Sequence, residues 1–569
     1  MATPNPDHVL QRPRGASAAA QPSFASPPDQ TRRKLALGIS TVIAGSCCAL
    51  PLLSGCGDGN GGQVLVSSAQ QAQLEAVLPQ FDAWASATLA RSAVPGMAVA
   101  VVQGERVAHM KGFGVRRAGS SDAVDADTVF PLASVSKPMA STVIAATLRH
   151  RAEWDTRIGT LDPGFALSDP LASAELTLRD LLSHRSGLAG AAGDLLEEIG
   201  YSSSEVLQRL RHVPLWRPFR QFHQYANMPF SEAGFALARS LGMDWASLCE
   251  TLLYAPLGMS STSSRHADFL ARANRVHSHV LAEGRYVERY DRDADVQAPA
   301  ASVSSSVRDL SVWVRLHLAN GRQGPRQLID GDVLAATREA VISTAAPGSA
   351  APARAFYGLG WNVATDDAGR VRISHSGAFN RGAATNVSMM PAEQLGIVVL
   401  TNGAPVGLPE ALARGFFDLM FNGMISRDHY AASNAVFIDF LRPRLILAND
   451  YSTAAQTISP PLPLSAYTGR YSNPFYGPLE ISHAGNTLSM SIGPWPVTRT
   501  LVHWNANVFI DASPGTPVPA PGTVDMAPGD LDIHYLGGLL FSIGSDGRAT
   551  AVRFEELDQH GEGSFMRVA

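Results

Sequence analysis

Two groups of strand-forming segments, set far apart along the chain, constrain its fold more than any other feature. The first is a hairpin within residues 97–115, whose two apolar runs meet at a Gln103-Gly104 turn. The second comprises four strands within residues 361–402, joined by short turns. The sequence between the two groups is helical or rich in loops. This order predicts an α+β fold: an antiparallel sheet, completed at its edge by the hairpin and flanked by helices, with a mostly helical subdomain.

The remaining patterns divide the chain into domains. A helical pattern begins near residue 70 and, together with the strands above, indicates a main domain over residues 70–435. A Pro-rich stretch is typical of a linker, which we place at residues 436–463. From residue 464 onward apolar and polar residues alternate, as in the runs between Leu479 and Ile492. Residues 464–569 are therefore predicted to form a small all-β, barrel-like domain.

Residues 1–55 predict a disordered N-terminus followed by an export signal. Arg32 and Arg33 precede an uncharged run over residues 35–53, and small residues then lead to Cys56. The tetrapeptide that ends at Cys56 resembles a bacterial lipobox, which implies an exported lipoprotein anchored through the lipid on Cys56, on the periplasmic side of the outer membrane. Residues 56–69 then form a flexible tether. An uncleaved membrane anchor is the alternative, and the choice between Sec and twin-arginine export stays open.

Lysine is nearly absent from this chain, which draws attention to the lysines that remain. Only three of its 45 basic residues are lysines, and one of them, Lys137, lies three residues after Ser134. On a helix this spacing places both side chains on one face. Pro138 is tolerated only in the first turn of a helix, so the helix should begin near Ser134. A buried amine, unlike a guanidinium, can lose its proton and activate a hydroxyl, whereas the plain alternative is an N-cap serine beside a solvated lysine.

Ser134-Val135-Ser136-Lys137 resembles the active-site motif of the serine β-lactamase and penicillin-binding-protein superfamily, especially its class C branch of D,D-peptidases and esterases. Further matches follow in the same order: residues 177–188, which contain His184, then Tyr225-Ala226-Asn227, and finally His375-Ser376-Gly377. The resemblance covers about residues 70–425 and implies a β-lactamase/transpeptidase-like fold. The C-terminal domain is similar to the lipocalin-like module of some relatives; it either shapes access to the active site or forms a separate binding surface.

The resemblance also assigns roles to the matched residues. Ser134 is the nucleophile, and Lys137 assists its deprotonation. Tyr225 takes the proton and returns it to the leaving group, and Asn227 holds Lys137 and the substrate amide. His184, a loop histidine before a turn, we interpret as structural.

The His375-Ser376-Gly377 segment completes the expected site. His375 is its catalytic member, Ser376 and Gly377 contact substrate, and the N–H group of Ala378 forms the oxyanion hole with that of Ser134. β-Lactamases and carboxypeptidases have a lysine at the position of His375, which holds a permanent cation beside the substrate carboxylate. Histidine is mostly neutral near pH 7, so we expect weak or absent β-lactamase activity.

Composition excludes several other functions. The chain carries 45 basic and 50 acidic residues, a formal net charge of -5, which gives no electrostatic footprint for nucleic acid. We find no metal-ligand spacing and no Gly-rich phosphate loop, so we expect no metal and no cofactor. The sequence predicts an exported serine hydrolase that cleaves a small ester, amide or peptide through an acyl-serine intermediate, as an esterase, D-amino acid amidase or peptidase. The alternative is an inactive lipoprotein of the same fold that acts as a binding or cell-wall scaffold; the oligomeric state is left open.

Overall fold

The computed structural model describes residues 66–568, apart from residues 283, 290, 346–354, 442–447, 450, 452–457, 496–497 and 512–536. The predicted export signal, Cys56 and most of the predicted tether lie outside the described residues. Within the described part of the chain, no helix has the length and apolar character needed to cross a membrane.

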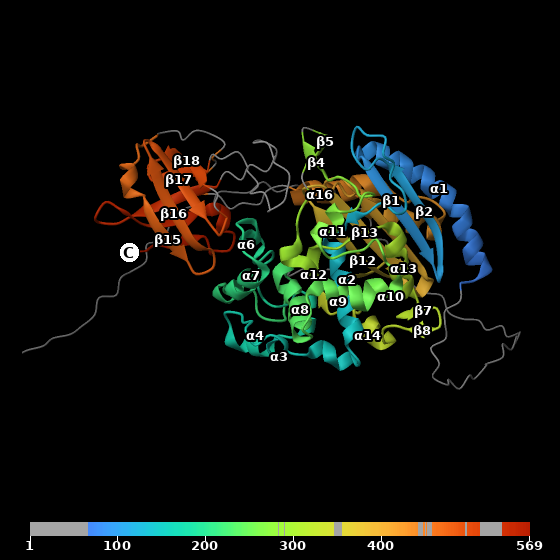
Figure 1. Cartoon of the computed structure of the whole chain (residues 1–569). Coiled ribbons are helices and arrows are strands. Elements are labelled where there is room, and N and C mark those ends of the chain that lie inside the picture. Colours follow the sequence, from blue (N-terminus) through green and yellow to red (C-terminus); the bar gives the residue numbers. More distant parts are fainter. Residues whose placement is uncertain are drawn as a thin grey trace, which may run out of the picture. The chain divides into compact units, whose positions relative to one another are not determined.

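An eight-stranded antiparallel sheet forms the centre of the main domain, with the strand order β2-β1-β14-β13-β12-β11-β10-β9 (Figure 1). Its strands are β1 (Gly96–Gln103), β2 (Arg106–Gly114), β9 (Ile342–Ser343), β10 (Ala355–Tyr357), β11 (Asn362–Thr365), β12 (Val371–Phe379), β13 (Ala383–Met390) and β14 (Leu395–Thr401). The hairpin joins the later strands through β1 and β14, where Val99 pairs with Val399. The predicted α+β class and the position of the hairpin at the sheet edge are therefore confirmed.

Helices cover both faces of this sheet, which explains why every residue of β1 is buried. On one face α1 (Ser68–Ser92) and α15 (Leu408–Asn422) pack against the odd-numbered residues of β1. Phe81 and Phe416 meet there with ring centroids 5.6 Å apart. On the other face α2 (Ser136–Thr147) and α13 (Val307–Leu318) pack against Ala98 and Ala100. The alternation follows from the two-residue period of a strand.

A mostly helical subdomain lies between β2 and β9 in the sequence, as predicted (Figure 1). Its helices are α3 (Ile158–Leu161), α4 (Pro170–Glu175), α5 (Leu178–Leu182), α6 (Asp194–Glu198), α7 (Ser203–Arg209), α8 (Asn227–Ser240), α9 (Trp245–Cys249), α10 (Ala255–Leu257), α11 (His266–Leu270), α12 (Ala298–Ala301) and α14 (Gly331–Ala336). The short strand pairs are β3 (Phe130–Pro131) with β6 (Ser304–Ser305), β4 (His279–Ala282) with β5 (Arg285–Glu288), and β7 (Arg322–Gln323) with β8 (Arg326–Gln327).

The C-terminal domain is a closed barrel of antiparallel strands, which confirms the predicted small all-β barrel. Its strands are β15 (Gly469–Asn473), β16 (Gly477–Ala484), β17 (Thr487–Ile492), β18 (Thr498–Asn505), β19 (Val508–Asp511), β20 (Gly538–Ile543), β21 (Ala549–Phe554) and β22 (Ser564–Arg567). Leu479 and Ile481 of β16 are buried while Glu480 between them is exposed, as period-two alternation requires. One boundary differs from the prediction: α16 (His429–Leu441) extends past residue 435 into the segment predicted as linker, because the first helix-breaking residue after it is Pro443.

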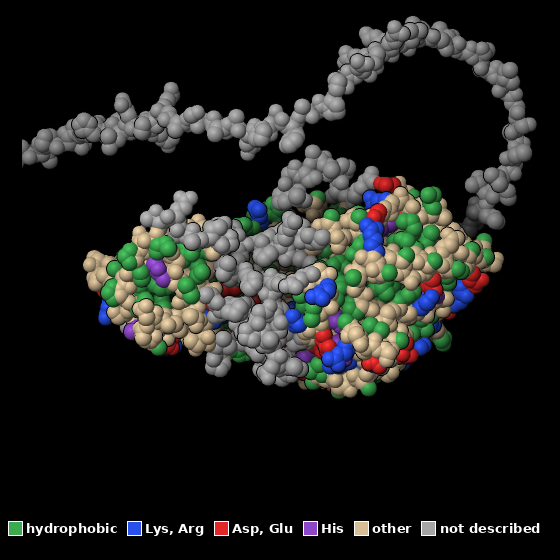
Figure 2. Space-filling model, turned by 90° about the horizontal axis from the view of Figure 1, so that it is seen from above, with side chains coloured by type: hydrophobic (Ala, Val, Ile, Leu, Met, Phe, Trp, Pro, Cys, Tyr) green, Lys and Arg blue, Asp and Glu red, His purple; other side chains and the backbone are tan. Residues whose placement is uncertain are grey.

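Charged side chains are sparse and mixed in sign on the face that Figure 2 shows, where blue and red groups lie singly or beside one another. Many charged side chains of the described structure are paired, including those of the Arg308–Asp127 and Arg157–Glu175 bridges. No continuous basic patch is visible on the described side chains of that face.

The short helix η1 (Ala133–Val135) is held directly against β12 by a glycine. A Cβ atom at Gly377 would lie 2.0 Å from the carbonyl oxygen of Leu132 and 2.3 Å from Oγ1 of Thr385. Thr385 Oγ1 also donates a hydrogen bond to the Leu132 carbonyl, at 2.7 Å. Only glycine allows the backbone of η1 to approach the sheet this closely.

We expect Gly377→Ala to lower the free energy of unfolding by about 1–3 kcal/mol, the usual cost of overpacking, because backbone atoms must move to admit the methyl group. Gly159→Ala is the matched control: no atom lies within 4 Å of a Cβ at that position in α3. Thermal unfolding of both variants measures the difference. Equal melting temperatures for the two variants would show that the contact at Gly377 is loose.

Candidate active site

Ser134 lies in a strained turn at the entrance to α2. The predicted helix start is a 3₁₀ turn, η1, which leads into α2 at Ser136. Ala133, just before Ser134, has φ 48°, in the left-handed region that non-glycine residues rarely adopt. The turn is held on both sides by Val303, whose carbonyl accepts from the N–H of Leu132 and whose own N–H donates to Ser136 Oγ. The fold therefore presents Ser134, which is partly exposed, at the N-terminal end of a helix.

Lys137 is completely buried beneath Ser134. Its Nζ lies 3.1 Å from Ser134 Oγ, 2.7 Å from Asn227 Oδ1 and 3.1 Å from the carbonyl oxygen of Ala300 in α12. Nζ also lies 4.6 Å from the centre of the Tyr225 ring. Helix α2 supplies the amine, α8 supplies the amide and α12 supplies the carbonyl, so three separate elements fix its position.

The chemistry of these three partners determines where the lone pair of a neutral Lys137 amine points. The oxygens of Asn227 and Ala300 can only accept hydrogen bonds, so they take the two N–H groups of the neutral amine. The lone pair is then left for the third neighbour, Ser134, whose hydroxyl can donate to it. The arrangement therefore aims the base at the hydroxyl proton.

Burial makes the neutral form of Lys137 accessible. It lowers the pKa of the amine from 10.5 to about 7, although the carboxylate of Asp194 partly opposes this shift. A sizeable fraction of the amine is therefore unprotonated at neutral pH. This is the range in which a general base works best.

The pKa of Tyr225 is shifted so as to keep its proton, unlike that of Lys137. Burial raises the pKa of its phenol above the usual 10, and a hydrogen bond with Ser134 only partly opposes that shift. The hydroxyl therefore stays protonated at neutral pH and can donate a proton. Its ring is packed against the buried imidazole of His184, with centroids 4.4 Å apart.

His184 supports Tyr225 without reaching Ser134, in keeping with its structural interpretation. Its Nδ1 accepts a hydrogen bond from the N–H of Ala226, at 3.3 Å, and burial holds its pKa well below 6.5. Its φ of 56° is again in the left-handed region. A strained backbone thus places this ring between Tyr225 and Phe230.

His375 is neutral, and both ring nitrogens are occupied. Its Nδ1 lies 2.7 Å from the carbonyl oxygen of Ser376, which can only accept, so Nδ1 carries the proton. Its Nε2 therefore accepts from the hydroxyl of Tyr357, at 2.9 Å. Burial and the neighbouring charge of Lys137 lower the pKa of the imidazole to about 3. His375 consequently supplies no positive charge to the site, although it lies on β12 near Tyr225, with ring centroids 6.4 Å apart.

The other members of the predicted site separate into two groups. His375 and Gly377 lie on the face of β12 that meets η1, whereas strand alternation turns Ser376 to the opposite face. There the Ser376 hydroxyl accepts a hydrogen bond from Asn386 Nδ2, at 3.1 Å, on the side of the strand away from Ser134. Ala378 follows on β12, paired with Ala384.

Three residues that sequence reasoning missed complete the cluster: Asp194, Ala300 and Tyr357. Asp194 accepts a hydrogen bond from Asn227 Nδ2, and the carbonyl oxygen of Ala300 accepts one from Lys137 Nζ. The hydroxyl of Tyr357 is hydrogen-bonded to His375 Nε2. Ala300 acts through its backbone, and no signal in the sequence could indicate it. Tyr357 ends β10 and Asp194 begins α6, both outside the motifs matched in the sequence, so only tertiary structure brings them to the site.

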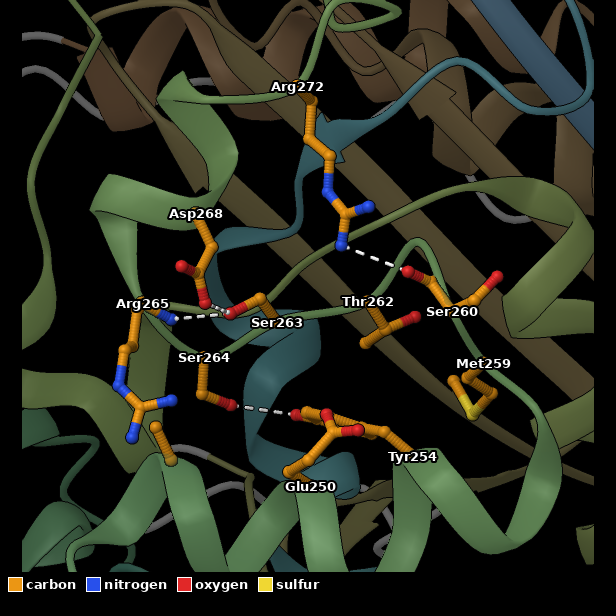
Figure 3. A pocket seen from close by; sticks show the side chains of 11 residues that line it. Glu250, Tyr254, Met259, Ser260, Thr262, Ser263, Ser264, Arg265, Asp268 and Arg272 are labelled. Atoms are coloured by element: carbon orange, nitrogen blue, oxygen red, sulfur yellow. Dashed lines mark hydrogen bonds between the residues drawn. The ribbon is translucent and has the colours of Figure 1, made fainter.

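A polar cavity of about 150 Å³ lies within the helical subdomain, lined by residues of the segment 246–272 (Figure 3). Its side chains pair largely among themselves: Tyr254 with Ser264, and Ser263 with Asp268. None of Ser134, Lys137 or Tyr225 lines it. Among the described residues, no group of His, Cys, Asp and Glu side chains is placed to hold a metal ion.

The Beta-lactamase family model matches residues 81–415, which is more than half of the chain and includes Ser134, Lys137, Tyr225 and His375. The chain belongs to the beta-lactamase family. The predicted resemblance is thereby confirmed. A second model, a domain of unknown function named DUF3471, matches residues 453–565. The C-terminal barrel is therefore matched by that domain model, and the lipocalin-like resemblance holds only in part.

Curated relatives in this beta-lactamase family share about a quarter of their residues with the chain. The unguisins hydrolase ungD of Aspergillus violaceofuscus is 26% identical over 72% of this chain and 76% of its own length. Penicillin-binding protein 4 of Amycolatopsis lactamdurans is 25% identical over 62% of this chain and 91% of its own length. The D-alanyl-D-alanine-carboxypeptidase/endopeptidase AmpH of Escherichia coli is 23% identical over 60% of this chain and 87% of its own length.

Among solved structures, the octameric penicillin-binding protein homologue from Pyrococcus abyssi superposes with a TM-score of 0.52. The match covers 86% of this chain and 100% of that one, at 15% identity. At this identity the likeness shows a common fold.

We expect a fluorophosphonate probe to label Ser134 at a rate that rises with pH and is half-maximal near pH 7, because the ammonium form of Lys137 has no lone pair. Lys137→Arg should slow labelling by about 100-fold or more, the usual contribution of a general base, since a guanidinium keeps its proton. Lys111→Arg is the matched control: Lys111 is exposed and paired with Asp82. A labelling rate that is independent of pH, or equal rates for both variants, would exclude Lys137 as the base.

Proposed function

We propose that this protein is a serine hydrolase that cleaves an ester or amide through an acyl-Ser134 intermediate. The observation that carries the proposal is the buried amine of Lys137, which lies 3.1 Å from Ser134 Oγ and whose pKa is lowered to about 7. The names of the relatives support this reaction class, because they include a hydrolase and a D-alanyl-D-alanine-carboxypeptidase/endopeptidase.

The geometry supports the following sequence of steps. Lys137 Nζ takes the proton of Ser134 while Oγ bonds to the substrate carbonyl carbon. The carbonyl oxygen becomes an oxyanion, for which the backbone N–H groups of Ser134 and Ala378 are the proposed donors. The bond to the leaving group then breaks as Tyr225 donates its phenolic proton, and the proton on Lys137 restores the phenol. Water attacks the acyl-serine in the same manner and releases the acid.

The two pKa shifts favour a different first step from the one that the family resemblance implies. The resemblance lets Tyr225 take the serine proton. Burial raises the pKa of Tyr225 above 10 and lowers that of Lys137 to about 7, so at neutral pH the amine is the group ready to accept a proton. We therefore assign the base to Lys137 and the acid to Tyr225.

The neutral state of His375 favours substrates without a carboxylate at that side of the site. Tyr357 and the Ser376 carbonyl satisfy both ring nitrogens, and the lowered pKa keeps the imidazole uncharged throughout the working pH range. A β-lactam antibiotic carries a carboxylate, to which the neutral His375 offers no positive charge. Neutral esters and amides avoid the free-energy cost of bringing an unpaired carboxylate into the site.

The inactive scaffold is the less favoured alternative. A protein that only binds a partner gains nothing from a buried lysine with a lowered pKa or from left-handed backbone beside the serine. Such features lower stability and are typical of functional sites.

A substrate panel with Ser134→Ala as the control tests the function. We expect the wild-type protein to hydrolyse neutral aryl esters or amino acid amides, and to turn over a chromogenic cephalosporin at least about 100-fold more slowly, a difference of roughly 3 kcal/mol in transition-state binding. Peptide mass spectrometry should locate the acyl group on Ser134, and the variant should be inactive. Activity that survives in Ser134→Ala would exclude the acyl-serine route, and efficient cephalosporin turnover would contradict the carboxylate argument.

We also propose that the protein is an exported lipoprotein. The sequence around Cys56 supports this, with paired arginines, an uncharged run and a lipobox-like tetrapeptide in that order. In a Gram-negative host, we expect radiolabelled palmitate to enter the wild-type protein and the protein to sediment with membranes. Cys56→Ala should abolish the label and release the chain from that fraction, whereas Cys249→Ala, which changes a buried thiol, should leave both unchanged. Palmitate in the Cys56→Ala protein would contradict the proposal.

A further inference from the structure

The amide of Asn227 has to point one way for Lys137 to act as a base. With its oxygen toward Nζ, as observed at 2.7 Å, the amide takes one N–H of the amine. With its NH₂ group turned toward Nζ, the amide would donate to the lone pair of a neutral amine, or would repel a charged one. The reversed amide would therefore occupy the lone pair that Ser134 needs.

Asp194 is the partner at the other end of this amide. Its Oδ2 lies 2.9 Å from Asn227 Nδ2. A carboxylate accepts hydrogen bonds and cannot donate them, so it favours the NH₂ end of the amide and disfavours the oxygen end. Its second oxygen, Oδ1, is buried and has no hydrogen-bond partner among the described residues. The amide of Asn227 is thus the one group on the described chain to which the Asp194 side chain is hydrogen-bonded.

The backbone around Asp194 is built to bring it to Asn227. Asp194 begins α6 and follows Gly193, whose φ is 94°. A Cβ at Gly193 would lie 3.0 Å from Met228 Cγ, so the chain passes directly against the residue after Asn227. The N–H of Ala191 also donates to the carbonyl of Tyr225, at 3.0 Å, which ties the two segments together.

The charged groups around Asp194 are compatible with this role. Burial, and to a smaller extent Glu197 on the same helix, raises the pKa of Asp194 to about 7, while Asn227, Arg292 and Lys137 oppose that rise. Glu197 itself is paired with Arg292, at 2.9 Å, and accepts from Gln297. The Asn227 amide and Arg292 therefore favour the carboxylate form of Asp194, which is the form that accepts from Asn227 Nδ2.

We propose that Asp194 is a positioning residue of this active site: it fixes the Asn227 amide so that the amide oxygen faces Lys137 and the lone pair of the amine stays on Ser134. The proposal rests on the proposed function, because it concerns the activation of Ser134. Asp194 does not touch the reacting atoms in the described structure and acts through Asn227.

Two substitutions separate orientation from charge. Asp194→Leu removes the acceptor at similar volume, whereas Asp194→Asn removes the charge and leaves an amide that can accept from Asn227 in one of its two orientations. We expect kcat to fall about tenfold in Asp194→Asn and about 100-fold in Asp194→Leu, with KM changed less than about threefold, because the base and not substrate binding is affected. Equal losses in both variants, or an unchanged kcat in Asp194→Leu, would overturn the proposal.

A double-mutant cycle with Asn227→Ala tests whether the effect passes through the amide. In that background we expect Asp194→Leu to change the rate of fluorophosphonate labelling by less than about twofold, since the group that it orients is gone. A further loss of about tenfold or more in the double mutant would show that Asp194 acts by another route. Circular dichroism and melting temperature confirm that each variant is folded, and Glu198→Leu, an exposed position on the same helix, is the matched control.

The labelling readout also separates this proposal from the proposed function. If the wild-type protein is not labelled at Ser134, the acyl-serine function fails. If the wild-type protein is labelled and Asp194→Leu is labelled equally fast, only the role of Asp194 fails.

Discussion

The burial of one amine between two carbonyl oxygens is the interaction on which this active site depends. Lys137 has no exposed surface, and its three hydrogen-bond neighbours come from separate elements. Desolvation destabilises the ammonium form, and the two acceptor oxygens direct the N–H groups of the neutral amine away from Ser134. Without burial the amine would hold its proton at neutral pH, and without the two acceptors its lone pair would have no fixed direction.

The carboxylate and the imidazole beside Lys137 are likewise held by hydrogen bonds. Asp194 is held by the far end of Asn227, and His375 is held by Tyr357 and the Ser376 carbonyl. Burial keeps His375 neutral, and it keeps Tyr225 protonated. In the proposed mechanism, Lys137 is the single base and Tyr225 the single acid. The surrounding polar groups determine orientation.

Sequence reasoning succeeded where the information is local and periodic. The three-residue spacing of Ser134 and Lys137 places both groups on one turn of chain. Apolar runs bounded by turn residues located the hairpin and the late strands, and two-residue alternation located the C-terminal barrel. The same alternation could have shown that Ser376 faces away from His375 and Gly377. The left-handed turn at Ala133 could not be predicted, because alanine has no preference for that conformation. Asp194, Ala300 and Tyr357 reach the site only through tertiary packing, so one sequence without that packing gives no reason to select them.

The contact between Gly377 and Leu132 has a consequence for how the site is assembled. The two proposed oxyanion donors, the N–H groups of Ser134 and Ala378, belong to segments that are far apart in the sequence, yet each lies within two residues of this contact. Their separation is therefore set by direct backbone packing between a turn and a strand in the middle of a covered sheet. In the proposed mechanism, the spacing of these two donors would thus be a property of the packed core and not of a surface loop.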